Sequence, residues 1–171
     1  MTTPRVLGLD PSLTATGVAL PDGTLDTLRP QAAGDHRLLH LHEALVDRLD
    51  RQPRPTLAVV EDLPLHARAA GLVGMAQGVI RLVLVAWGVP TVAVPPATLK
   101  TYATGRGNAT KADMRVELLK RTGLDVRDDN QVDAAWLRLL GLDLAGHPEL
   151  DLPKTHRRAL AKLPAIEEVI R

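Results

Sequence analysis

Hydrophobic and polar positions follow a strand-like pattern in the first part of the chain and a helical one directly after it. Residues 5–10 form an apolar run that ends in Asp10, and residues 16–28 turn at Pro-Asp-Gly, which predicts a strand and then a β-hairpin. Leucines recur at helical spacing over residues 35–50, which predicts an amphipathic helix with Asp35 as its N-cap. The chain therefore opens with three antiparallel strands and a helix.

Strands and helices alternate through the rest of the pattern. Residues 56–62 and 89–96 are short valine-rich runs, and the apolar, glycine-containing segment 67–88 between them predicts a long helix that packs closely on a neighbour. Residues 99–114 predict a loop that leads into the next helix. Residues 123–144 predict a turn and a last core helix, so the second half supplies crossover connections between parallel strands.

This order of elements predicts an α/β fold. We expect a five-stranded mixed sheet, with three antiparallel strands followed by two parallel ones, flanked by helices. A length of 171 residues fits one domain of ordinary size. We assign residues 1–150 to this domain and residues 151–171 to a short basic helical extension of it, whose charges either contact nucleic acid or form a solvated face.

The composition restricts the available chemistry. Because the chain has no cysteine, a metal ion would need carboxylate, amide or histidine ligands, and oxygen ligands suit Mg²⁺. The formal charge of +1 gives no global attraction to nucleic acid, so a polyanion would have to meet a local basic surface. The sequence shows no signal-peptide pattern and no apolar run near the roughly 18 residues of a membrane span, so we expect a cytoplasmic protein.

Three carboxylates stand where the expected elements end or begin. Asp10 closes the first strand, Glu61 closes the fourth, and Asp133 lies one turn into the last core helix. If the first and fourth strands are parallel neighbours, Asp10 and Glu61 emerge side by side, and two like charges so close are costly without a cation. Each acid alone is typical of a turn or a helix cap. Together they predict a pocket for one or two divalent ions, an arrangement that can hydrolyse a phosphodiester.

Four segments of the chain follow one another over about residues 5–145: LGLDPSLTATGVAL, VVEDLP, TGRGNATKADM and DDNQVDAAWLRLL. Together they resemble one known family, the RuvC-type Holliday junction resolvases of the ribonuclease-H-like superfamily. The resemblance implies a ribonuclease-H-like fold and a homodimer that makes paired nicks in a four-way DNA junction, with phage-encoded versions of the family as one alternative. It also implies that the cofactor is Mg²⁺ or Mn²⁺, with two ions in each active site, and that the protein uses no nucleotide cofactor.

The same resemblance implies that Asp10, Glu61 and Asp133 are metal ligands, and it leaves the fourth ligand open. The family usually has Asp or His three residues before the last Asp, where this chain has Asn130, with Asp129 one position earlier. Both positions share a helix face with Asp133. Asn130 can ligate through its amide oxygen but cannot act as a general base, whereas Asp129 can do either.

Basic residues surround the glycine-containing loop that precedes the third predicted helix, where backbone amides and cationic side chains can meet phosphates. The resemblance places Lys100 and Lys111 beside the scissile strand and gives Lys111 a role in stabilising the transition state. Tyr102 either stacks on a base or anchors the segment, and Leu63 or Leu65 is a candidate apolar wedge for the junction. The expected DNA contacts are Lys100, Tyr102, Arg106, Asn108, Lys111 and Arg68.

Other classes of protein share some of these features. Sugar kinases and actin-like ATPases also begin with a strand, an Asp and a Gly/Thr-rich hairpin, but they need two such domains and leave Asp133 unexplained. A ribosomal-RNA-processing nuclease of the same superfamily would share the carboxylates, and a non-catalytic junction-binding protein is compatible with Asn130. We therefore predict a metal-dependent, structure-selective endodeoxyribonuclease that acts on branched DNA, with the last two classes as alternatives.

Overall fold

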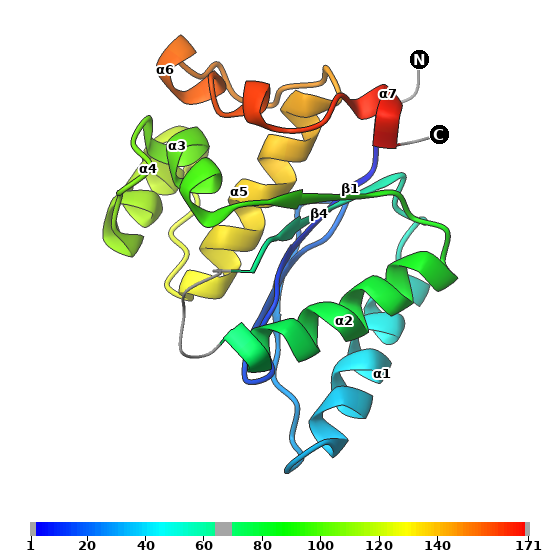
Figure 1. Cartoon of the computed structure of the whole chain (residues 1–171). Helices are drawn as coiled ribbons and strands as arrows, with labels where there is room; N and C mark the ends of the chain where they lie inside the picture. The colour runs from blue at the N-terminus through cyan, green and yellow to red at the C-terminus, as the bar shows by residue number, and fades with distance from the viewer. Residues whose placement is uncertain (1–2, 64–69, 170–171) are drawn as a thin grey trace.

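The centre of the molecule is a five-stranded sheet, seen in a computed structural model that describes residues 3–63 and 70–169 (Figure 1). β1 pairs antiparallel with β2, and β2 antiparallel with β3, whereas β1, β4 and β5 pair in parallel. This is the predicted mixed sheet of the ribonuclease-H-like fold. In spatial order the strands are β3 (Leu25–Leu28), β2 (Thr16–Ala19), β1 (Val6–Asp10), β4 (Leu57–Glu61) and β5 (Thr91–Val94).

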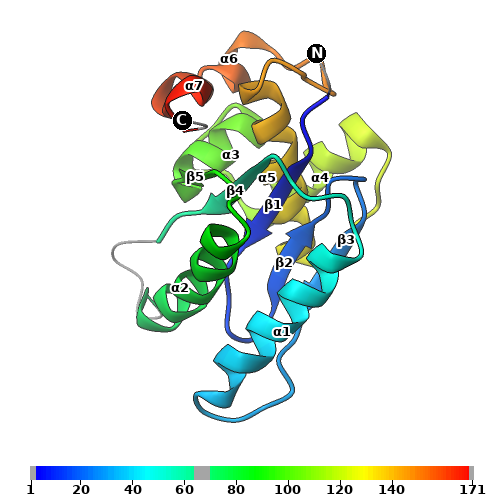
Figure 2. The same cartoon turned by 90° about the vertical axis from the view of Figure 1, so that its right-hand side faces the viewer.

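Helices cover both faces of the sheet, as the two views in Figures 1 and 2 show. Because successive side chains of β1 point to opposite faces, Leu7 and Leu9 join one core cluster and Val6 joins the other. The helices of the first cluster are α1 (His36–Asp50) and α2 (Ala70–Ala86); those of the second are α3 (Pro96–Thr104), α4 (Lys111–Thr122) and α5 (Asp129–Leu144). Among the described residues, no helix has both the length and the apolar character needed to span a membrane.

The C-terminal tail is packed onto the second cluster. It contains α6 (Lys154–Arg157), a single 3₁₀ turn (Leu160–Lys162) and α7 (Ile166–Val169). Leu152 and Ala159 are buried in the same cluster as α3 and α5. The tail therefore forms short helical turns, and its buried apolar residues share the core of the domain.

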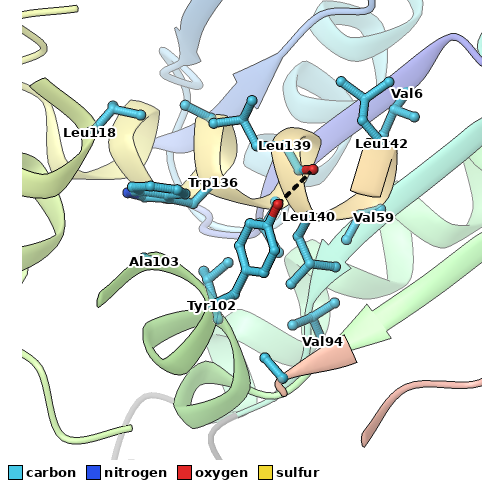
Figure 3. Packing of buried hydrophobic residues seen from close by; sticks show 14 of the residues in the cluster. Val6, Val59, Val94, Tyr102, Ala103, Leu118, Trp136, Leu139, Leu140 and Leu142 are labelled. Carbon is cyan, nitrogen blue, oxygen red and sulfur yellow. Dashed lines mark hydrogen bonds between the residues drawn. The ribbon is translucent and has the colours of Figure 1, made fainter. Parts of the chain in front are cut away.

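A helix replaces part of the predicted loop at residues 99–114. Pro96 occupies the first turn of α3, where its missing N–H leaves no intrahelical hydrogen bond unmade, and Gly105 ends the helix with a left-handed φ of 78°. The hydroxyl groups of Thr101 and Thr104 bond back to carbonyl oxygens four residues earlier in the helix. Burial against α5, which Figure 3 shows at Tyr102 and Trp136, therefore outweighs the loop-like composition. The α3 side chains in this core are Leu99, Tyr102 and Ala103.

The helix caps differ from one another. Asp35 precedes α1 as predicted, but the prediction that its side chain caps the helix is wrong, because its backbone is helical and the carboxylate accepts no cap hydrogen bond. By contrast, Asp128 accepts a hydrogen bond from the Asn130 N–H at the start of α5. Thr110 and Asp113 form a reciprocal capping box at the start of α4. Both α4, which bears Lys111, and α5, which bears Asp133, therefore have firmly fixed N-termini.

Two glycines let α5 approach the sheet more closely than any other residue type would allow. A Cβ atom on Gly8 would lie 2.2 Å from the Ala134 carbonyl oxygen, and one on Gly17 would lie 2.0 Å from the Asn130 carbonyl oxygen. Both clashes are with backbone, which cannot rotate away. The close contact places the first turns of α5 directly over the ends of β1 and β2.

Candidate active site

Three carboxylates from distant parts of the chain meet at one edge of the sheet. Asp10 and Glu61 are the last residues of β1 and β4, which are adjacent parallel strands, so their side chains leave the sheet at the same edge. Asp133 reaches them from α5, which the glycine contacts hold against the sheet. Each of the three residues offers a carboxylate oxygen, and these oxygens all lie within 4.8 Å of one another. The predicted acidic pocket is therefore present.

The protonation of these acids is set by burial. Asp10 is 8 % exposed and Asp133 is 1 % exposed. Burial, together with the charge of Glu61, raises the pKa of Asp10 to about 9. Burial and the charge of Asp133 raise the pKa of Glu61 to about 7, and burial also raises the pKa of Asp133. Without a cation, the site therefore still holds protons near neutral pH, where ordinary carboxylates are fully deprotonated.

Lys111, the first residue of α4, forms an ion pair with Asp133 Oδ2. Burial lowers the pKa of Lys111, but the carboxylates of Asp133, Asp10 and Glu61 together more than offset this and raise the pKa above its usual value. Lys100 on α3 is close enough for its charge to lower the pKa values of Glu61 and Asp133. Two lysines from successive helices therefore flank the acidic pocket.

The donor set fits a hard divalent cation. Asp133 Oδ1 is buried and has no hydrogen-bond partner in the described part of the chain, although its sister oxygen is paired with Lys111. A buried carboxylate oxygen without a partner is costly, and a cation between the three acids would satisfy it and relieve their mutual repulsion. Oxygen-only ligands of this kind are those that Mg²⁺ and Mn²⁺ prefer.

Asn130 and Asp129 lie on the first turn of α5 in different surroundings. Asn130 packs over the start of β2, because its Cβ lies 3.1 Å from where a Cβ of Gly17 would be. Gly17 pairs with Asp10 in the sheet, so Asn130 lies beside Asp10. Its amide nitrogen donates to Asp128 Oδ1 at 2.8 Å, which leaves the amide oxygen free of that contact. Asp129 is exposed, and its charge contributes to the raised pKa of Asp133.

Asp128 is a structural centre that the sequence analysis did not single out. Besides its two bonds from Asn130, it accepts hydrogen bonds from the Thr27 hydroxyl at 2.9 Å and from Arg29 at 2.5 Å. Although burial raises the pKa of Asp128, these bonds outweigh burial and lower the pKa to about 2. Asp128 thus joins α5 to β3 beside the site. The acidic run around Asp128 indicated an N-cap in the sequence. Its partners Thr27 and Arg29 could not be recognised there, because they lie about a hundred residues away.

The remaining predicted DNA contacts occupy several environments. Arg106 and Asn108 are exposed on the turn between α3 and α4. The base-stacking role considered for Tyr102 is wrong, because this ring is 1 % exposed, packs edge-on against Trp136 and donates its hydroxyl to the Leu139 carbonyl (Figure 3). The alternative role as an anchor of the segment is the one that the structure supports.

The segment after β4 carries further predictions. Arg68 and Leu65 lie outside the described residues. Leu63 is half-buried, and its methyl groups lie 3.8 and 3.9 Å from where a Cβ of Gly74 on α2 would be. The glycines of the long helix were expected to admit a close neighbour. Within the described part of the chain this holds only for Gly74, because no described atom lies within 4 Å of where a Cβ of Gly71 or Gly78 would be.

A ribonuclease-H-like sheet with converging carboxylates and flanking lysines defines a class of nucleases with acidic sites. No family model matches the sequence, but curated relatives do. The chain is 31 % identical over 157 residues to the crossover junction endodeoxyribonuclease RuvC of Nocardia farcinica, covering 84 % of this chain and 73 % of the relative. It is 32 % identical over 153 residues to that of Frankia casuarinae, covering 81 % and 88 %. The chain belongs to the RuvC family of crossover junction endodeoxyribonucleases.

Solved structures agree with this assignment. Thermus thermophilus RuvC, in complex with a Holliday junction substrate, matches 82 % of this chain and 92 % of its own with a TM-score of 0.68 and 25 % identity. The yeast mitochondrial Holliday junction resolvase matches 94 % of this chain and 82 % of its own with a TM-score of 0.50 and 13 % identity, a likeness of fold alone.

Proposed function

We propose that this protein cuts four-way DNA junctions at the pocket formed by Asp10, Glu61 and Asp133. The observation that carries the proposal is the convergence of these three carboxylate oxygens within 4.8 Å in a member of the RuvC family. The Thermus relative is described in complex with a Holliday junction, which supports the same substrate here. The ribosomal-RNA and binding-only alternatives remain outcomes of the experiment below.

The proposed cofactor is Mg²⁺ or Mn²⁺, with two ions per site. Asp10, Glu61 and Asp133 would hold the ions, and Asn130 would add its amide oxygen as a neutral fourth ligand. The position of Asn130 over Gly17, beside Asp10, supports this choice over the exposed Asp129. When bound, such ions activate a water molecule and stabilise the leaving oxygen of a phosphodiester.

The lysines would act on the phosphate rather than on the ions. Lys111 stays charged at neutral pH because its pKa is raised, so it can stabilise the extra negative charge of the transition state. Lys100 would bind the neighbouring phosphate, and Arg106 and Asn108 would extend the contact along the strand. These residues lie on α3, on the start of α4 and on the turn between them.

The proposed active form is a homodimer that pairs through α2. Four large apolar side chains of this helix are exposed by 39 % to 77 %, and their spacing places them on one stripe. Gly71 and Gly78 lie on the same stripe with open space in front of them, so a second helix can approach closely. Exposed apolar patches of this kind mark interaction surfaces. The four side chains are Leu72, Met75, Leu82 and Val85.

A strand-resolved cleavage assay tests the function. The substrates are a synthetic four-way junction, a splayed fork, a linear duplex and an RNA/DNA hybrid, each with and without Mg²⁺ or Mn²⁺. We expect symmetric nicks in the junction that depend on the metal ion. Cutting of structured RNA in place of the junction would support the ribosomal-RNA alternative, and binding without cutting at any metal concentration would support the binding-only alternative.

Substitution of one carboxylate identifies the site. We expect Asp10→Asn to reduce junction cleavage by more than about a hundredfold, since even outer-shell partners of metal ligands contribute up to that factor, while junction binding is largely kept. Asp62→Asn is the matched control, because Asp62 follows Glu61 but lies outside the carboxylate cluster and accepts a hydrogen bond from the Leu63 N–H. Full cleavage by Asp10→Asn would disprove the proposed site.

A further inference from the structure

The basic residues of the tail bond to the protein itself. Three successive residues, His156, Arg157 and Arg158, each contact α3, the turn after it or α5; we call these three residues the tail clamp. In Figures 1 and 2, α6 lies alongside α3, and the two helices are in contact. A basic tail that is only a solvated face would not place three consecutive side chains against neighbouring elements of the domain.

Arg157 anchors the tail clamp. It donates to Asp143 Oδ1 at 2.5 Å, and the Asp143 side chain is fully buried. The Tyr102 hydroxyl of α3 shares its single hydrogen between the Leu139 carbonyl oxygen at 3.2 Å and the other oxygen of the same carboxylate at 3.3 Å. A buried charge needs such partners, so this ion pair fixes the tail to α5 and α3 together.

His156 and Arg158 hold the C-terminal end of α3. The His156 ring donates from Nδ1 to the Tyr102 carbonyl oxygen at 2.9 Å, and Arg158 donates to the Gly105 carbonyl oxygen at 3.0 Å. The His156 ring also lies 3.2 Å from where a Cβ of Gly105 would be, so it packs directly on the turn. Donors and positive charge at a helix C-terminus satisfy its free carbonyl groups and favour its dipole.

The turn held in this way leads into the proposed DNA-contact region. The Thr104 hydroxyl accepts from the Arg106 N–H at 3.2 Å, and the chain then continues through Asn108 to Lys111. Arg106 and Asn108 are exposed and lie within three residues of Gly105. Their position relative to Lys111 therefore depends on how firmly the turn at Gly105 is fixed.

We propose that Arg158 and His156 are positioning residues that fix the turn at Gly105, so that Arg106 presents its charge to the DNA strand entering the active site. This inference rests on the proposed function. In this proposal Arg158 acts through Arg106, because its guanidinium group donates to the Gly105 carbonyl oxygen next to Arg106.

Amide hydrogen exchange without DNA tests the clamp by itself. In Arg158→Ala we expect the amides of Gly105, Arg106 and Ala109 to exchange about threefold to tenfold faster, the effect of losing one hydrogen bond, with unchanged global unfolding. Arg158 is exposed, so the variant keeps its fold. Lys154→Ala is the matched control, since Lys154 is an exposed cation of α6 outside the clamp. Unchanged exchange in Arg158→Ala would overturn the proposal.

A double-mutant cycle tests the role in DNA binding. Affinity for a four-way junction is measured in EDTA for Arg158→Ala, Arg106→Ala and the double variant. If Arg158 acts through Arg106, its substitution weakens binding in the wild-type background and has no further effect when Arg106 is absent. Additive losses would identify Arg158 as a separate phosphate contact and overturn the proposal. A wild-type protein that binds no junction would disprove the proposed function instead. The hydrogen-exchange result would still show whether Arg158 fixes the turn at Gly105.

Discussion

The buried carboxylates of Asp10 and Glu61 give the site an electrostatic cost that depends on pH. In the unfolded chain both acids are surrounded by water, whereas in the folded protein burial and their mutual repulsion favour the protonated forms. A bound cation removes this cost by favouring the charged forms instead. Folding stability and metal affinity are therefore linked through the same two side chains.

We predict that the metal-free protein loses stability as the pH rises. Between the ordinary value of 3.8 and the folded value of about 9, Asp10 holds more protons in the folded than in the unfolded state, so the free energy of unfolding falls with pH. Glu61 adds to the fall up to about pH 7, and Lys111 stays charged throughout. Thermal unfolding in EDTA should show this slope, and Asp10→Asn should flatten it. An equally steep slope in Asp10→Asn would contradict the assignment.

The fourth ligand gives a second prediction for single residues. We expect Asn130→Ala to weaken Mn²⁺ binding by about tenfold or more, because the amide oxygen beside Asp10 is lost, and Asp129→Ala to change it less. Calorimetric titration of Mn²⁺ measures both affinities directly. The reverse order of effects would assign the ligand to Asp129.

The three acids could be predicted from the sequence because each stands at the end of a strand or at the start of a helix with a clear pattern. Asp128 could not be recognised as a structural centre, since its partners Thr27, on β3, and Arg29, just after β3, lie about a hundred residues earlier in the sequence. Tyr102 could be left only as two alternatives. Its burial depends on α3 forming a helix, which local composition did not indicate.

At the scale of elements, α5 is the part that assembles the site. It contacts β1, β2, β3 and β4, and its close approach depends on the absence of side chains at Gly8 and Gly17. The strands and α5 were predictable because their apolar patterns are strong. The helix α3 was not, because its stability comes from burial against α5 and from the tail clamp, which are contacts between distant segments.

We predict that Gly17→Ala displaces the first turn of α5. The added Cβ would lie 2.0 Å from the Asn130 carbonyl oxygen, so the helix must move, with an expected loss of about 1–3 kcal/mol in the free energy of unfolding. Mn²⁺ affinity should fall as well, because Asn130 and Asp133 move with the helix. Urea unfolding and calorimetry measure the two effects.

The control for this substitution is Gly74→Ala, where an added methyl group would lie at an ordinary van der Waals distance of 3.8 Å from the Leu63 side chain. It should leave Mn²⁺ affinity unchanged and alter stability by no more than about 1 kcal/mol, the effect of helix propensity. Unchanged metal binding in Gly17→Ala would show that the close approach of α5 is not needed for the site.

At the scale of the whole molecule, the exposed stripe of α2 leads to a prediction about assembly. We expect Leu82→Glu to convert a dimer into a monomer, because Leu82 is 63 % exposed in the single chain and a buried charge at the interface would be costly. Leu39→Glu on α1 is the matched control, since Leu39 is 53 % exposed outside that stripe. Sedimentation measures the mass of each variant, and a monomeric wild-type protein would disprove the dimer.

The convergence of Asp10, Glu61 and Asp133 also determines when a newly made chain becomes able to act. Asp133 is synthesised 123 positions after Asp10 (133 − 10), on the helix that must dock across two finished strands. A nascent chain that ends before α5 therefore holds two of the three acids and has no complete pocket. The proposed ability to cut DNA therefore arises only after α5 has been synthesised and has docked on the sheet.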